Sequence, residues 1–125
     1  MSQPELSPYL REQIARYEQI QQNLQAVMVQ KQQVELETGE TTRALEELAK
    51  ASDTESIYKY AGSLLIKVTK DSVVKELTEK KELANTRSMV LAKQEARFKE
   101  NLKELQTRID DAVKGKAPQA AADEE

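Results

Sequence analysis

Apolar residues recur at alternating spacings of four and three along two long stretches of this chain. In residues 6–48, nine of the thirteen positions at this spacing are apolar. The same spacing returns over residues 74–112. A repeat of this kind is typical of the narrow apolar seam of a coiled coil. It predicts two long helices, and each needs a packing partner along its whole length.

A few polar residues interrupt the seam. The first stretch contains Leu6, Leu10, Gln13, Tyr17, Ile20, Leu24, Val27, Lys31, Val34, Thr38, Thr41, Leu45 and Leu48. The second contains Val74, Leu77, Lys81, Ala84, Ser88, Leu91, Glu95, Phe98, Leu102, Leu105, Ile109 and Ala112. Several interruptions fall near one another once the chain folds back, and Gly39 lies among them at a helix cost of about 1 kcal/mol relative to Ala. Two interpretations stay open: a compliant section of the arm, or polar residues that specify register.

Residues with strong capping preferences mark the expected helix ends. Ser7 followed by Pro8 is a good start for the first helix, because Ser caps and Pro fits the first helical position. Asp71 is a plausible N-cap for the second helix. Gly115 makes a good stop, which Pro118 reinforces.

Between the two seams the sequence changes from helical to strand-like residues. Ser56 to Ala61 and Leu64 to Thr69 are rich in β-branched, aromatic and aliphatic residues and flank a Gly62-Ser63 turn, as in a β-hairpin. The second strand is apolar on both faces, and such strands are usually buried from both sides. A two-stranded hairpin alone is marginal in water. We therefore expect other subunits to cover this hairpin, through the side chains of Ile57, Tyr58, Leu64, Leu65, Ile66 and Val68.

The predicted fold is mainly α: a long antiparallel two-helix coiled-coil hairpin, joined by a short β-hairpin that oligomerises into a β hub. A chain reversal near residue 61 aligns the helices, with Leu10 near Ile109 and Leu48 near Val74. We expect one domain and a disordered tail, divided as residues 1–114 (helix about 6–50, β-hairpin about 56–69, helix about 71–114) and residues 115–125.

Composition excludes several classes of function. Charged residues make up 33% of the chain and aromatic residues 4%, which suits long helices better than a compact core. The chain has no Cys and no His, so disulfides, thiol chemistry and histidine-based catalysis or metal binding are excluded. No nucleotide-binding or catalytic motif is present, so we expect no enzyme, no cofactor and no metal. A net charge of −3 without a basic face argues against a nucleic-acid partner.

The N-terminal residues are polar, so a signal peptide is not expected, and no apolar run is long enough to span a membrane. A cytoplasmic protein is the prediction. Apolar residues gather at the two helix ends far from the predicted hairpin, where they either close the seam or contact another protein. We favour contact with client proteins. The residues concerned are Leu6, Tyr9, Leu10, Ile109 and Val113.

Two helical heptad stretches around one central hairpin resemble the β-type subunit of prefoldin, in an archaeal form. The most specific block runs from Tyr58-Lys59-Tyr60-Ala61-Gly62 to Val68. The resemblance covers about residues 6–114 and implies an ATP-independent chaperone. It implies a hexamer of two α-type and four β-type subunits, which captures unfolded proteins at its coiled-coil tips and passes them to a group II chaperonin.

The same pattern has two other interpretations, which the residues disfavour. A structural or tethering coiled coil has no use for a β segment at its centre, and a helical arm that binds nucleic acid needs a basic face.

Overall fold

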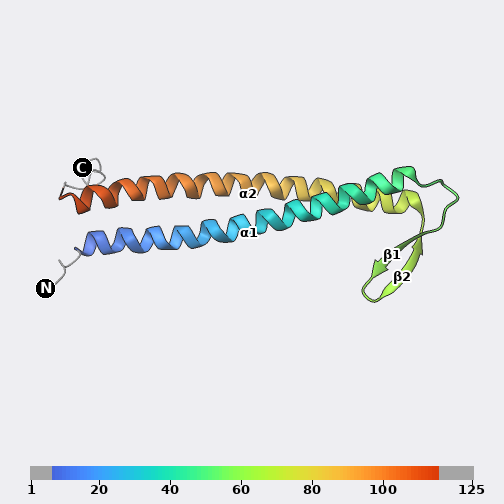
Figure 1. The fold of residues 1–125 in the computed structure, drawn as a ribbon, viewed down its shortest axis with the longest axis horizontal. Coiled ribbons are helices and arrows are strands. Elements are labelled where there is room, and N and C mark those ends of the chain that lie inside the picture. The colour runs from blue at the N-terminus through green and yellow to red at the C-terminus, as the bar shows by residue number, and fades with distance from the viewer. Residues whose placement is uncertain (1–6, 116–125) are drawn as a thin grey trace. The chain divides into compact units, whose positions relative to one another are not determined.

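The computed structural model describes residues 7–115 of the chain. It contains four elements in the order α1 (Pro8–Lys50), β1 (Ile57–Ala61), β2 (Leu64–Val68) and α2 (Lys70–Val113). The two long helices pack together and are joined by the two-stranded antiparallel hairpin (Figure 1). The predicted mainly α fold, two long packed helices joined by a short antiparallel β-hairpin, is therefore confirmed, and assembly of the hairpin into a hub stays a prediction. Leu6, Pro118 and the predicted tail from residue 116 lie outside the described residues.

The chain divides into two compact units. The terminal unit comprises Met1–Val29 and Leu91–Glu125, and the hairpin unit comprises Gln30–Val90. The prediction of a single domain over residues 1–114 stays a prediction, and each unit is described by itself.

The first helix starts at the predicted cap. The backbone N–H of Leu10 donates to Ser7 Oγ at 3.0 Å, and that of Arg11 donates to the Ser7 carbonyl at 3.0 Å. Pro8, the first helical residue, has no N–H that needs a partner.

The predicted cap of the second helix was wrong. Thr69, not Asp71, is the N-cap: its Oγ1 accepts from the Ser72 N–H at 3.2 Å, and its carbonyl accepts from the Val73 N–H at 3.1 Å. Thr69 follows β2 directly, so its extended backbone already suits an N-cap. Asp71 lies inside the first turn instead, where its negative charge interacts favourably with the helix dipole. At its other end α2 stops at Val113, and Gly115 has the positive φ of +82° expected of a glycine stop.

In the terminal unit the predicted seam is buried or half-buried at every described position. Leu10, Val27, Leu91 and Leu105 are its most enclosed apolar side chains. The N-terminal part of α1 (blue) and the C-terminal part of α2 (red) lie at the same end of this unit, as the colours of Figure 1 show. The two helix segments are therefore antiparallel, as predicted.

In the hairpin unit the seam is again buried or half-buried throughout. Val34 is the most enclosed side chain, with 1% of its surface exposed, and Ala84 is also buried. Val73 is buried too, although it is one residue away from the predicted seam position at Val74. It lines a cavity with Leu48 and Ile57, so the hairpin covers it.

The hairpin has the predicted turn. Ala61 pairs with Leu64, so Gly62 and Ser63 form a two-residue loop. Gly62 has a φ of +63° and Ser63 does not have a positive φ. A positive φ at the first loop position alone is the pattern of a type II′ turn, which matches the natural twist of paired strands.

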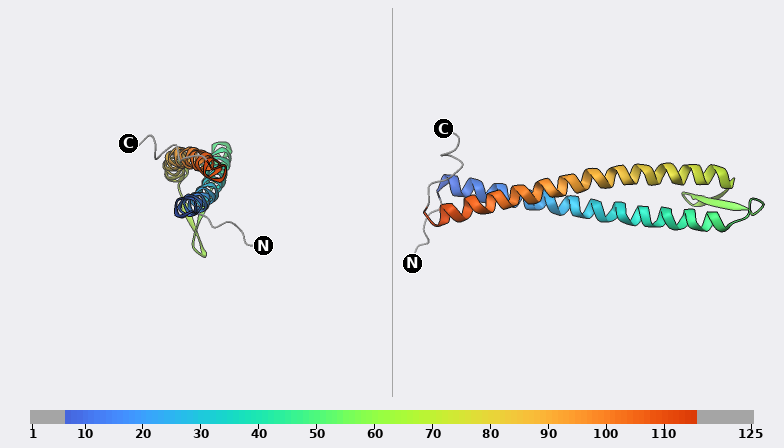
Figure 2. Two further views of the ribbon diagram at one scale, coloured as in Figure 1. Left: turned by 90° about the vertical axis from the view of Figure 1, so that its left-hand side faces the viewer. Right: turned by 90° about the horizontal axis from the view of Figure 1, so that it is seen from above.

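Polar contacts hold the hairpin beside the helices of its own unit (Figure 2). Lys59 Nζ donates to both carboxylate oxygens of Glu76, at 3.3 and 3.1 Å. Lys70 Nζ donates to the carbonyl of Ala51 at 2.8 Å and so closes the loop before β1. The Lys59–Glu76 contact turns the Lys59 face of the hairpin toward α2.

Candidate functional site

The outer face of the hairpin is apolar and exposed. Residues paired across two strands share a face, and the Tyr60–Leu65 and Tyr58–Lys67 pairs lie on the face opposite Lys59, whose amine contacts Glu76 of α2. Tyr60 is 79% exposed, Leu65 59% and Tyr58 56%. This large apolar area is unusual on a free protein surface and is typical of a contact with another molecule.

The inner face is covered only at one end. Ile57 and Val68, which pair with each other far from the turn, are half-buried against the helices. Nearer the turn, Leu64 and Ile66 are 65% and 42% exposed. Both faces of the hairpin are thus apolar and open near the turn. We call the exposed side chains Tyr58, Tyr60, Leu64, Leu65 and Ile66 the hairpin surface.

The strands also have free edges. The sheet contains only β1 and β2 in the described part of the chain, so each strand pairs along one edge. The other edge presents backbone N–H and C=O groups that can pair with a further strand. The hairpin therefore offers both apolar faces and hydrogen-bonding edges to a neighbouring hairpin.

The predicted client-contact residues lie at one end of the terminal unit, apart from Leu6, which is outside the described residues. Leu10 is buried with 7% exposure, Tyr9 and Ile109 are half-buried, and Val113 is 69% exposed. The side chains of this set thus differ widely in how accessible they are, and most of its described members help to close the seam. We call Tyr9, Leu10, Ile109 and Val113 the tip.

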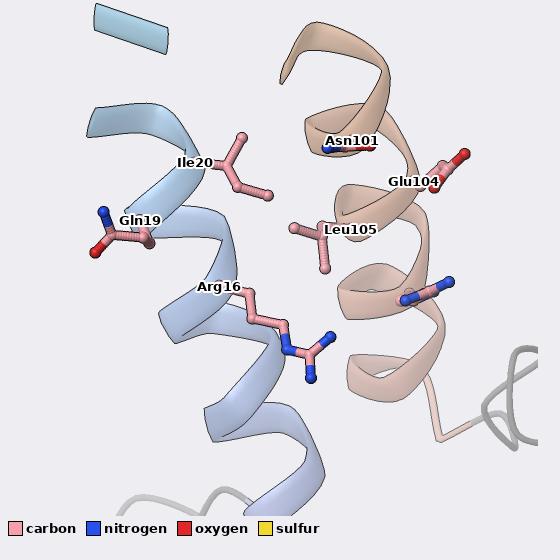
Figure 3. Close-up of a pocket in the computed structure, with 7 residues that line it drawn as sticks. Arg16, Gln19, Ile20, Asn101, Glu104 and Leu105 are labelled. Atoms are coloured by element: carbon pink, nitrogen blue, oxygen red, sulfur yellow. The ribbon is translucent and has the colours of Figure 1, made fainter. Parts of the chain in front are cut away.

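A shallow groove of about 300 Å³ lies further along the terminal unit. Figure 3 shows Ile20 and Leu105 pointing toward each other across the seam, with Arg16 and Glu104 at its borders. Arg16 is paired with Glu12 at 2.7 Å, so the groove carries little unbalanced charge on that side. The seam residues Ile20 and Leu105 form the bottom of the groove, so the groove is a normal feature of coiled-coil packing.

Several large apolar side chains on the helices are exposed away from the seam, and the sequence analysis did not identify them. In the hairpin unit these are Leu36, Leu83, Met89 and Val90, with 65%, 64%, 64% and 50% exposure. The sequence contains a signal for two of them. Leu83 and Val90 are seven residues apart, so they lie on one helix face outside the predicted seam. Sequence analysis also missed the Arg87–Glu37 ion pair between the helices, at 3.5 Å.

Among residues 7–115, no group of three or more acidic, His or Cys side chains is placed to hold a metal ion. Neither of the two helices has a stretch that is apolar enough over sufficient length to cross a membrane.

Comparison with known proteins gives consistent matches. A family model described as "Prefoldin subunit" matches residues 11–116. A prefoldin subunit beta from Archaeoglobus fulgidus is 41% identical over 116 residues, which cover 93% of this chain and 97% of the relative. One from Methanosarcina acetivorans is 38% identical over 113 residues, covering 90% and 97%. The crystal structure of the prefoldin beta subunit from Thermococcus strain KS-1 superposes with a TM-score of 0.78 at 39% identity, covering 88% of this chain and 96% of that one.

Proposed function

This chain belongs to the prefoldin family as a beta-type subunit, a non-enzymatic chaperone component, and from that premise we propose that it holds unfolded proteins without ATP. In this proposal the hairpin surface assembles subunits and the tip binds clients. The observation that carries it is a hairpin with two apolar faces and free edges, beside helices whose own seam is already closed.

Assembly through the hairpin surface follows from the cost of leaving it in water. Burial of apolar surface contributes about 25 cal/mol for each Å² removed from water. Leu64, Leu65 and Ile66 are all at least 42% exposed, so neighbouring hairpins have much area left to bury. The family implies a hetero-hexamer in which an α-type partner supplies two subunits and four are of this β type.

Client binding at the tip is the second part of the proposal. Tyr9, Leu10, Ile109 and Val113 supply apolar contact, together with Leu6 of the preceding segment. Each contact contributes at most about 1.5 to 3 kcal/mol when fully buried, and less at a helix end. One tip binds weakly, but several tips on one hub act together, because each further contact with the same client is intramolecular. Weak contacts that release one at a time need no ATP.

Release to a group II chaperonin and a cytoplasmic location complete the proposal. The family likeness supports the chaperonin as the receiving partner. The absence of Cys from the sequence is compatible with a reducing compartment.

The test removes the tip and keeps the hairpin. A variant that lacks residues 1–10 and 109–125 is compared with a control that lacks only residues 116–125, each mixed with a denatured client whose aggregation is followed by light scattering. We expect the control to protect the client as well as the full chain does. The tip deletion keeps its native mass and protects poorly, at low and at high salt. Full protection by the tip deletion would move the client site elsewhere, most simply to the faces of the helices.

A further inference from the structure

Two polar atoms near the start of α1 are buried without a hydrogen-bond partner among the described residues. They are the hydroxyl oxygen of Tyr9 and the side-chain carbonyl oxygen, Oε1, of Gln13. Gln13 is only 5% exposed and occupies a seam position. Buried polar atoms in folded proteins nearly always have a partner, so two orphans one helical turn apart need an explanation.

Backbone groups inside α1 offer no free donor to the Gln13 oxygen. Inside an α-helix each backbone N–H is already bonded to the carbonyl four residues before it. A hydroxyl in the seam meets no such difficulty, because it can donate to a carbonyl of its own helix. Thr38 does so, since its Oγ1 donates to the Val34 carbonyl at 2.8 Å. An amide oxygen only accepts, and no donor of the described residues, the Tyr9 hydroxyl included, bonds to Gln13 Oε1 in this structure.

We infer that Tyr9 and Gln13 bind the backbone of an extended client segment. A peptide N–H of the client donates to Gln13 Oε1, and the Tyr9 hydroxyl donates to a peptide carbonyl. This inference rests on the proposed function and states what the tip recognises: the main chain, with Leu10, Ile109 and Val113 supplying apolar contact beside it.

The position of the two residues lets them become accessible when the end of α1 opens. Tyr9 and Gln13 lie within the first two turns of α1, which begins at Pro8. Helix ends open locally at a small fraction of the free energy that global unfolding needs. Opening these turns exposes both orphan atoms together with the apolar seam residue Leu10. Every polypeptide carries N–H and C=O groups, so backbone recognition suits a site that has to accept unrelated sequences.

The experiment compares two synthetic apolar peptides of identical sequence, one with alternate backbone nitrogens methylated so that those N–H donors are lost. Binding to the full-length chain is measured by fluorescence anisotropy. We expect the unmodified peptide to bind about fivefold more tightly, a ratio that corresponds to one net hydrogen bond. In Gln13→Leu this ratio falls to about one, because the acceptor that distinguishes the peptides is gone. Gln13→Met, closer to Gln in length, behaves in the same way.

Tyr9→Phe and Thr38→Val complete the set. Tyr9→Phe weakens the binding of both peptides to the same extent, because methylation of the backbone nitrogens leaves the peptide carbonyls intact. Thr38→Val removes a seam hydroxyl that already has a partner, and it keeps the wild-type ratio. Circular dichroism verifies that each variant remains helical.

The outcomes separate this inference from the proposed function. If the wild-type chain binds both peptides equally, or Gln13→Leu keeps the wild-type ratio, backbone recognition by Gln13 is refuted while client binding stands. If the wild-type chain binds neither peptide, client binding itself fails, and the inference fails with it.

Discussion

The seam of the hairpin unit and strand β2 both carry large apolar side chains, yet the environments of those side chains are opposite. Val34 in the seam is 1% exposed, whereas Leu64 in β2 is 65% exposed. The difference lies in how many sides each element needs covered. A coiled-coil helix has one narrow apolar stripe, which the second helix of the same chain covers. A strand that is apolar on both faces needs cover from two directions, and the helices supply only part of one.

This contrast teaches that apolar composition alone does not say whether a segment is buried by its own chain. The seam makes a folded arm, and the hairpin surface makes a contact for something else.

Charges placed in β2 should abolish assembly while the arm remains folded. Leu65 lies on the outer face and Ile66 on the inner face, so Leu65→Asp with Ile66→Asp puts a carboxylate on each. Burying such charges in an assembled hub costs on the order of several kcal/mol. We expect loss of the native mass by light scattering, with helical content retained by circular dichroism.

The matched control for that experiment is Leu83→Asp with Val90→Asp. These side chains have similar exposure, 64% and 50%, but lie on α2 outside the seam. We expect the control to keep its native mass. An unchanged oligomer in the β2 variant would show that the hairpin surface does not carry assembly.

Shortening a side chain in the seam should have the opposite effect, with a lower free energy of unfolding and an unchanged native mass of the oligomer. Val34→Ala removes two methyl groups from the most enclosed side chain and should lower the free energy of unfolding by about 2 to 3 kcal/mol. Val90→Ala, at a half-exposed position, should change it by no more than about 0.5 kcal/mol. Urea denaturation measures both. Equal effects at the two positions would remove the distinction between seam and surface.

Replacement of glycine by alanine should raise stability inside α1 and lower it in the hairpin turn. Gly39 lies inside α1, and a Cβ built there meets nothing within 4 Å, so Gly39→Ala should raise stability by up to about 1 kcal/mol. Gly62 has a φ of +63°, which strains an L side chain, so Gly62→Ala should lower stability by about 1 to 2 kcal/mol. Melting temperatures measure both changes.

Hydrogen exchange extends the Gly39 test to the hypothesis of a compliant arm. That hypothesis expects the amides of residues 38–42 to exchange faster than those around Ile20 and Leu24. Equal protection in the wild-type chain would leave register specification as the role of the polar seam residues.

Much of the fold could be read from local patterns. The 4-3 repeat placed every described seam residue on the correct helix face, because helical periodicity is a property of the backbone and does not depend on context. The Gly62-Ser63 turn and the Ser7 cap were equally local, since each depends on a few adjacent residues. For the candidate sites, the sequence identified the hairpin residues as strand-forming and apolar. Whether those residues and the tip carry assembly and client binding stays a prediction.

Periodicity and short-range turn chemistry are thus enough to specify two helices with one seam and a hairpin between them. Only the tertiary structure decided which residues those elements bring together. Thr69 caps α2 because β2 ends at Val68, and Val73 is buried because the hairpin folds over it. Gln13 fits the seam pattern like its neighbours, but its oxygen lacks a donor. A hydrogen bond requires a particular atom within about 3 Å, and spacing along the chain does not specify that distance.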